Sequence, residues 1–343
     1  MIHGTPQTGQ APWRAELAAA VCDPEELLRA LALPEDLLPA ARRAHRLFPV
    51  RVPRAYLARI LPGDPRDPLL RQVLPLDLEE VAAPGYSKDP VGDLGAQAVP
   101  GVLHKYEGRA LLTTTGACAI HCRYCFRRHF PYAKANAARD RWRPAISHLA
   151  NDPSIREVIL SGGDPLMLGD DKLGALTRAL EGVPHIKRLR LHTRVPVVIP
   201  NRVDEGLLDW LGRTSLPVVM VLHANHAREI DEAVAGACER LRKAGVTLLN
   251  QAVLLAGVND DVQTLAELSE RLFEAGVLPY YLHMLDRVEG AGHFAVDESC
   301  ATGFLEALRA RLPGYLVPRL VREEAGATAK LPVLAVGAGA SCR

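Results

Sequence analysis

Three closely spaced cysteines constrain this chain more than any other feature of its sequence. Cys118, Cys122 and Cys125 follow a C-x₃-C-x₂-C pattern on one short stretch, and no fourth cysteine lies nearby. Cubane iron–sulfur clusters are normally held by four thiolates, so a loop with three would leave one iron open to chelate a small molecule, as an open zinc site does. Two alternatives remain at this point: a zinc site closed by His121 or His129, and cysteines buried for structural reasons.

The rest of the composition fits a protein of a reducing compartment. The chain has 343 residues, enough for one large or two small domains, and 41 Lys and Arg balance 40 Asp and Glu. This balance gives no electrostatic basis for binding nucleic acid or a membrane surface. The other cysteines are scattered and do not form the framework of a disulfide-stabilised secreted domain; they are Cys22, Cys238, Cys300 and Cys342.

No targeting or membrane segment is expected. Residues 1–7 lack a basic region followed by an apolar stretch, so they do not resemble a signal peptide. No run of about eighteen apolar residues occurs. We therefore expect a cytoplasmic protein.

We expect three segments along the chain. Residues 1–95 favour a helical lead-in and a proline-rich connector without chemistry of its own, in which Asp23 is the N-cap of a helix. Residues 96–312 alternate short apolar runs with longer amphipathic runs, which predicts βα units around a parallel sheet. Residues 313–343 hold one more strand-like run, 314–321, and a lysine-bearing loop. The six strands predicted in the middle segment are 110–115, 157–160, 188–191, 216–222, 247–253 and 278–283.

The predicted fold is an α/β fold with a partial, open TIM-like barrel of six βα units, because closure would need eight. A doubly wound sheet is the alternative. Two of the intervening helices, 229–244 and 260–275, are followed by Gly245 and Gly276, which suit helix C-termini.

Polar and glycine residues follow each predicted strand at the point where the strand ends. Because ligands of α/β barrels bind at the carboxyl ends of the strands, we expect these residues to converge at one mouth. In strand order they are the three cysteines, then Gly162, Gly163 and Asp164, then Arg194, His223, Gln251 and Asp286.

Several of these residues also have an ordinary structural interpretation. Gly162, Gly163 and Asp164 could clamp the amino group of a ligand bound to the cluster, because glycine lets a backbone approach closely, but a plain turn explains them as well. For Arg194 and His223 the alternative is an ordinary polar residue at a barrel mouth.

Basic and aromatic residues outside the strand ends complete the candidate set. Arg127 and Arg128 directly follow the third cysteine, and arginine binds carboxylates bidentately, although both could simply offset the negative charge of the cluster. Lys330 lies beside small residues and could form an imine with an aldehyde, although an exposed loop lysine is the ordinary interpretation. Tyr106 and Arg109 could stack on and pair with a phosphorylated ring.

The cysteine spacing, with Tyr124 before the third cysteine, resembles the radical S-adenosylmethionine superfamily. The longer run from Cys122, CRYCFRRHFPY, is similar to the lysine 2,3-aminomutase family. Within that family the chain is most similar to bacterial members that make (R)-β-lysine for modification of elongation factor P. Further segments that fit are DPLLRQVL from Asp67, VPGVLHKY from Val99, SGGDPL from Ser161, NQAVLLAGVND from Asn250 and PYYLH from Pro279.

The resemblance implies three cofactors. Cys118, Cys122 and Cys125 would bind a [4Fe–4S] cluster whose open iron is chelated by S-adenosylmethionine. Lys330 would be catalytic and would form an imine with pyridoxal 5′-phosphate. We expect further cofactor contacts from Tyr106, Arg109, Tyr124, Gly162, Gly163, Asp164, Arg194, His223 and Gln251.

The resemblance also implies an isomerase that converts L-lysine to β-lysine. Arg127 would grip the substrate carboxylate, while Asp286 and Glu323 would receive the side-chain ammonium; Glu323 stands where mutases of free lysine have aspartate. The product would pass to a ligase that acts on elongation factor P, and an external one-electron reductant would be needed. The alternatives are an aminomutase for another amino acid, such as glutamate or arginine, and a non-catalytic iron–sulfur or zinc protein. The acid pair argues against glutamate, and a non-catalytic protein leaves Lys330 unexplained.

Overall fold

The computed structural model describes residues 11–133 and 142–334, so residues 1–7 and Cys342 lie outside the described part. Within it, ten strands form one sheet in chain order from β1 to β10. Neighbouring strands from β3 to β9 are parallel. These strands are β3 (Arg109–Thr115), β4 (Glu157–Gly162), β5 (Arg188–Thr193), β6 (Val218–His223), β7 (Thr247–Val253), β8 (Leu278–His283) and β9 (Arg319–Arg322).

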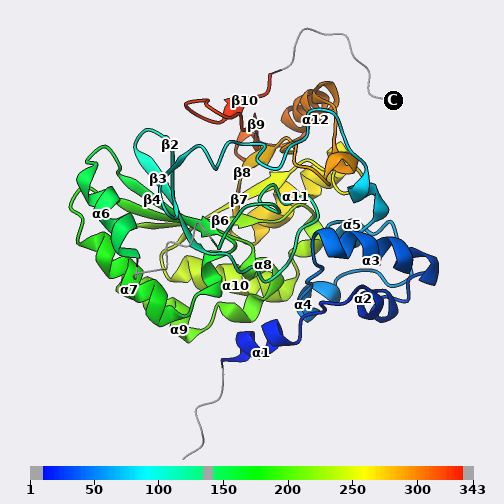
Figure 1. The fold of residues 1–343 in the computed structure, drawn as a ribbon, viewed down its shortest axis with the longest axis horizontal. Coiled ribbons are helices and arrows are strands. Elements are labelled where there is room, and N and C mark those ends of the chain that lie inside the picture. The colour runs from blue at the N-terminus through cyan, green and yellow to red at the C-terminus, as the bar shows by residue number, and fades with distance from the viewer. Residues whose placement is uncertain (1–10, 134–141, 335–343) are drawn as a thin grey trace, which may run out of the picture.

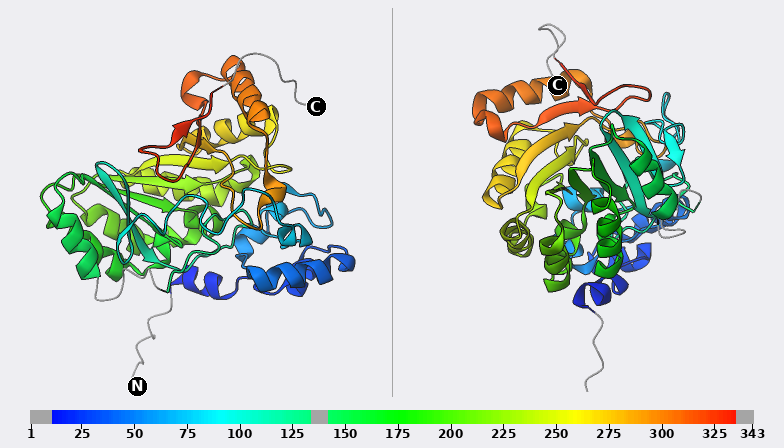
Figure 2. Two further views of the ribbon diagram at one scale, coloured as in Figure 1. Left: turned by 45° about the horizontal axis from the view of Figure 1, so that its top comes forward. Right: turned by 90° about the vertical axis from the view of Figure 1, so that its left-hand side faces the viewer.

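The predicted α/β class and its six parallel strands are confirmed, with closely similar bounds. The central strand β4 is buried at every position, as expected of a strand covered on both faces. The sheet is curved and open: in the described residues no pairing joins β1 to β10 (Figure 2). The carboxyl ends of the parallel strands therefore line one rim.

Helices cover the outer face of the curved sheet (Figure 1). Asp231 and Asp261 are the N-caps of α10 and α11, each accepting a hydrogen bond from a backbone N–H at 2.9 Å. Both helices end before a glycine with positive φ, Gly245 at 83° and Gly276 at 74°, as predicted. The helices of this part are α6 (Arg143–Asn151), α7 (Asp170–Glu181), α8 (Val195–Val198), α9 (Glu205–Arg213), α10 (Glu232–Lys243), α11 (Val262–Glu274) and α12 (Glu298–Arg311).

The lead-in is helical, and its helices gather at one side of the molecule (Figures 1 and 2). The predicted N-cap Asp23 accepts a hydrogen bond from the Glu26 backbone N–H at 3.0 Å. The connector is tied to the barrel by a β-bridge between Ser87 and Val288. The helices of the lead-in are α1 (Pro12–Ala18), α2 (Pro24–Ala30), α3 (Leu38–Leu47), α4 (Arg54–Leu57) and α5 (Pro68–Arg71).

Two antiparallel additions to the sheet were not predicted. β1 (Gln97–Val99) and β2 (Val102–Tyr106) form a meander with β3. The strands are short and the turns are made by Gly101 and Gly108, both at positive φ, so no run of alternating residues was long enough to indicate them. Tyr106 is consequently part of a strand.

The C-terminal strand is shorter than predicted. Residues 314–321 begin with a 3₁₀ turn, Gly314–Leu316, and only then enter β9, which runs parallel to β8 as a seventh parallel strand. β10 (Leu331–Pro332) turns back antiparallel to β9, so Lys330 lies in the loop that joins them.

One apolar core cluster contains residues from Trp13 in α1 to Val333 after β10. The division of the chain into segments 1–95, 96–312 and 313–343 stays a prediction. None of the described helices is both long and apolar enough to cross a membrane.

Candidate functional site

A cavity of about 350 Å³ lies at the carboxyl ends of the parallel strands. Most residues that the sequence singled out as site candidates line it, although the role of each stays a prediction; Arg128 does not line it and pairs with Glu79 instead. Those that line it are Tyr106, Arg109, Cys118, Cys122, Tyr124, Cys125, Arg127, Gly162, Gly163, Asp164, Arg194, His223, Gln251, Asp286, Glu323 and Lys330.

The three cysteines lie on the loop that follows β3. Burial raises the pKa of the Cys125 thiol to about 11, and the neighbouring Cys122 adds to the effect. A buried thiol ionises when a metal binds it, because the metal supplies the missing positive charge. Three thiols without an acidic or imidazole partner among the described residues suit an iron–sulfur cluster, in which the thiolates bind different irons.

The zinc alternative gains no support. Within residues 11–133 and 142–334, no three His, Cys, Asp or Glu side chains gather as ligands of one metal ion. The two histidines considered for closure each contact a backbone carbonyl: His121 Nδ1 lies 2.8 Å from Pro49 O, and His129 Nε2 lies 3.3 Å from Glu289 O.

The lead-in, for which no chemistry of its own was predicted, holds the cysteine loop in place. Arg123, between two of the cysteines, pairs bidentately with Glu79 of the lead-in at 2.7 and 2.6 Å, and Arg128 donates to the same carboxylate at 2.6 Å. The Arg123 backbone N–H also donates to Gln72 O at 2.9 Å. Both arginines and Glu79 have at most 1% of their side-chain surface exposed, so this contact is part of the interior.

The two glycines after β4 are required by backbone packing. A Cβ on Gly162 would lie 2.5 Å from the carbonyl oxygen of Thr115, and one on Gly163 would lie 2.3 Å from that of Ala117. The Gly163 N–H donates to Thr115 O at 2.7 Å, which pins β4 against the cysteine loop. The need for glycine at both positions is therefore explained without a ligand, and their role as a ligand clamp stays a prediction.

The Asp164 carboxylate ties the end of β4 to the start of α8. It accepts hydrogen bonds from Thr193 Oγ1 and the Arg194 N–H, both at 2.7 Å, and from two other backbone N–H groups. Burial raises its pKa to about 6, and these hydrogen bonds oppose the rise. Both carboxylate oxygens of Asp164 therefore have hydrogen-bond donors within the protein.

A chain of alternating charges crosses the cavity. Lys330 Nζ lies 2.7 Å from Glu323 Oε2. Lys105 Nζ bridges two carboxylates, since it lies 3.0 Å from Glu323 Oε1 and 2.5 Å from Asp93 Oδ1. Asp93 Oδ2 in turn accepts from Arg127 Nε at 2.7 Å. Burial alone would raise the pKa values of Glu323 and Asp93, but the lysines and arginine outweigh it and lower both. Asp93 and Lys105 were missed because neither stands at the end of a parallel strand.

Asp286 differs from these carboxylates because it has no partner within residues 11–133 and 142–334. In the described residues no side chain makes a hydrogen bond or ion pair with its carboxylate, and it is half-buried in the wall of the cavity. Burial, with a smaller contribution from Glu323, raises its pKa to about 7. An unpaired carboxylate facing a cavity can receive a cationic group.

Aromatic rings and neutral imidazoles surround Lys330. The β-bulge opposite Asn250 and Gln251 brings the neighbours Tyr280 and Tyr281 both into the wall, and Lys330 Nζ lies 6.0 Å from the Tyr281 ring centroid. Burial lowers the pKa values of His192 and His283 well below the usual range, and the Nε2 atom of each has no partner in the described residues.

Tyr106 lines the same cavity, with the Arg109 guanidinium 4.6 Å from its ring centroid. A lysine, tyrosine rings, a nearby arginine and two imidazoles whose Nε2 atoms have no partner in the described residues fit a flat, phosphorylated aldehyde such as pyridoxal phosphate.

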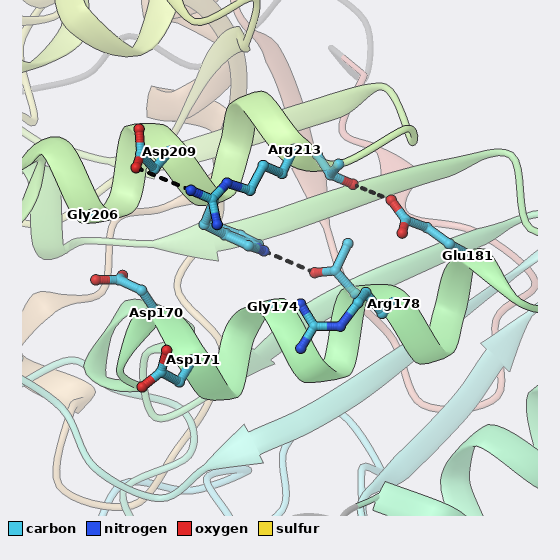
Figure 3. Close-up of a pocket in the computed structure, with 11 residues that line it drawn as sticks. Asp170, Asp171, Gly174, Arg178, Glu181, Gly206, Asp209 and Arg213 are labelled. Carbon is cyan, nitrogen blue, oxygen red and sulfur yellow. Dashed lines mark hydrogen bonds and ion pairs between the residues drawn. The ribbon is translucent and has the colours of Figure 1, made fainter.

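A second hollow, of about 390 Å³, lies between α7 and α9 on the outer side of the barrel (Figure 3). Its walls are joined by hydrogen bonds from Trp210 Nε1 to Thr177 Oγ1 and from Thr214 Oγ1 to Glu181 Oε1, both at 3.0 Å, while Arg213 pairs with Asp209 within α9. None of the candidate residues lines it. These contacts account for the packing of the two helices.

Comparisons with known proteins agree with this geometry. The Radical SAM superfamily model matches residues 112–269. The L-lysine 2,3-aminomutase of Escherichia coli K12 is 51% identical over 322 residues, which cover 94% of this chain and 94% of that protein. The enzyme of the same name from Haemophilus influenzae is 49% identical, covering 92% of this chain and 93% of its own length, and that of Clostridium subterminale is 35% identical, covering 94% and 77%.

Proposed function

The chain belongs to the lysine 2,3-aminomutase family of radical S-adenosylmethionine enzymes, and we propose that it converts L-lysine to (R)-β-lysine with the help of pyridoxal phosphate. As a member of that family it is an aminomutase, an isomerase that moves an amino group within its substrate. The finer proposal concerns the substrate's groups and the residues that hold them.

The unpaired carboxylate of Asp286 is the observation that carries the proposal. A half-buried acid without a partner, beside the acid Glu323, makes a cavity that favours one cationic group of a ligand. On the same cavity Arg127 offers a guanidinium for a carboxylate. L-Lysine carries both an ammonium and a carboxylate, separated by a flexible chain.

The residues divide the work of binding and orienting. Lys330 provides the amine for covalent attachment of the cofactor, and Glu323 holds that amine at 2.7 Å. When bound, the cluster with S-adenosylmethionine supplies a carbon radical able to break an unactivated C–H bond, and pyridoxal phosphate supplies the π-system through which nitrogen migrates. The protein's own task is to fix the substrate and keep water away, and the buried strand ends suit both.

The fate of the product is a further part of the proposal. We propose that (R)-β-lysine passes to a ligase that attaches it to elongation factor P, and that an external one-electron reductant in the cytoplasm drives each activation. The two relatives that are about half identical over almost their whole length support a shared role for all three chains.

A cationic substrate distinguishes the proposal from a glutamate aminomutase. Glutamate would bring a second carboxylate toward Asp286 and Glu323, and like charges at close range repel. Arginine also has a cationic side chain, so it is the competitor that the product assay must separate.

The first test is direct product analysis. Reconstituted protein, incubated without oxygen with L-lysine, S-adenosylmethionine and a strong reductant, is expected to form β-lysine, and chiral chromatography is expected to show the R form. Omission of pyridoxal phosphate should abolish the product. Arginine and glutamate, supplied in place of lysine, serve as controls. Conversion of either one in preference to lysine would contradict the proposed substrate.

The affinity for lysine is expected to depend on pH through Asp286. Its pKa of about 7 means that the carboxyl group is largely neutral below that value and accepts an ammonium well only above it. The KM for lysine should therefore fall roughly tenfold per pH unit as pH rises toward 7, and level off above it. Initial rates from pH 6 to pH 8.5 measure this, and a KM that is constant below pH 7 would exclude Asp286 as the titrating group.

A further inference from the structure

The Arg194 guanidinium is held at the end of β5 by a buried network. Its Nη1 atom donates to the Cys122 sulfur and to the Tyr124 hydroxyl, both at 2.7 Å. Its Nη2 atom donates to Gln72 Oε1 at 2.6 Å and to Glu229 Oε2 at 2.8 Å. The Arg194 side chain is 6% exposed and the Glu229 side chain is fully buried, so solvent does not compete for these contacts.

Glu229 and Gln72 are themselves fixed. Glu229 Oε1 accepts from the backbone N–H groups of Asn225 at 2.9 Å and His226 at 3.2 Å, and from Gln72 Nε2 at 3.1 Å. The Glu229 carboxylate, in the β6–α10 loop, and the Gln72 side-chain amide, in the lead-in, therefore hold the guanidinium in a fixed position. Neither residue stood out in the sequence.

These contacts limit the hydrogen bonds that Arg194 can offer to a ligand. A guanidinium has five N–H donors, and four of those on Arg194 are used by the contacts above. Its Nε atom is the one that has no partner in the described residues. A bidentate grip on a ligand carboxylate would break contacts inside the protein, so the guanidinium acts on the sulfur that it already touches.

Cys122 differs from the other two cysteines because its sulfur accepts this hydrogen bond from Arg194. In the described residues no arginine or lysine side chain donates a hydrogen bond to the sulfur of Cys118 or Cys125. Hydrogen bonds to the sulfurs of an iron–sulfur cluster stabilise its electron-rich reduced form and thereby raise its reduction potential. Residues behind a metal ligand also help to retain the metal.

We propose that Arg194, held by Glu229 and Gln72, is a positioning residue that raises the reduction potential of the iron–sulfur centre through its hydrogen bond to Cys122. The inference rests on the proposed function, because it needs the cluster to be present. It gives Arg194, which the sequence placed only among the expected cofactor contacts, a role toward the cluster.

The test removes the ion pair as a whole. Arg194→Gln combined with Glu229→Gln leaves no buried charge without a partner, so the fold should persist. We expect the double variant to bind about four irons, as the unsubstituted protein does. Its midpoint potential, from a redox titration followed by electron paramagnetic resonance, should be more negative. A chelator should extract its iron roughly tenfold more readily.

A matched control exists in the same sheet. Arg190 and Glu157 form a second arginine–glutamate ion pair, between β5 and β4, which Arg188 joins at the surface and which contacts no cysteine in the described residues. Arg190→Gln with Glu157→Gln should leave the midpoint potential unchanged. An equal shift in both double variants, or no shift with Arg194 and Glu229 replaced, would overturn the inference.

Two further outcomes are distinguishable. If the unsubstituted protein binds no cluster, the proposed function itself fails. If the double variant does not fold, Arg194→Lys replaces it, because lysine keeps the charge but cannot make all the contacts of the guanidinium. This variant should show a smaller shift in the same direction, and an unchanged potential in a folded Arg194→Lys protein would again contradict the inference.

Discussion

Replacing Lys330 with alanine is expected to abolish borohydride-trapped attachment of pyridoxal phosphate. Product formation should fall by roughly a thousandfold or more, because loss of a covalent catalytic group typically costs that much in rate. Lys330 is the lysine in the β9–β10 loop, its side chain is 20% exposed, and its ammonium contacts Glu323. Removing the amine removes the atom that would bond to the cofactor aldehyde. Mass spectrometry after borohydride reduction reads out the attachment directly.

The fold should survive this substitution. Glu323 keeps Lys105 as a partner at 3.0 Å, so the buried carboxylate is not left alone. Lys172→Ala, at an exposed position of α7, is the matched control and should be labelled as the unsubstituted protein is. Undiminished labelling of Lys330→Ala, with the modified peptide mapped to another lysine, would place the attachment elsewhere.

The parallel part of the fold was predictable because its signals are local. Short apolar runs alternate with amphipathic runs, and aspartate N-caps and terminal glycines mark the helices, as at Asp231 and Gly245. The β1–β2 meander could not be found this way, because each strand is short and its pairing depends on β3. The shortened β9 shows the same limit, since a run of apolar residues does not say where a 3₁₀ turn gives way to a strand.

The cavity-lining residues were predictable for a different reason. Residues at the carboxyl ends of parallel strands must meet at one rim, so a list of strand ends is also a list of cavity residues. The residues that hold the arginines of the site in place were not predicted, because they come from segments without a periodic pattern. Gln72, Glu79 and Asp93 of the lead-in each contact an arginine of the site, and nothing local in the sequence distinguishes them from surface polar residues.

Replacing Asp286 with asparagine is expected to raise the KM for lysine by roughly ten- to a hundredfold, the cost of losing one charge-assisted hydrogen bond. Asp286 has no partner among the described side chains, so the substitution breaks no existing ion pair and should leave the fold intact. The remaining acid, Glu323, already contacts two lysines and cannot take over the whole interaction. Because the ammonium is bound equally in ground and transition states, kcat should change much less.

The same variant separates binding from pH effects. Asparagine does not titrate, so the fall in KM between pH 6 and pH 7 should disappear together with the affinity. Asp297→Asn, at the exposed N-cap of α12 where the side chain makes no capping hydrogen bond, is the control and should keep both the KM and its pH dependence. A normal KM in Asp286→Asn would mean that the substrate's ammonium lies elsewhere, and the cationic-substrate assignment would then lose its main support.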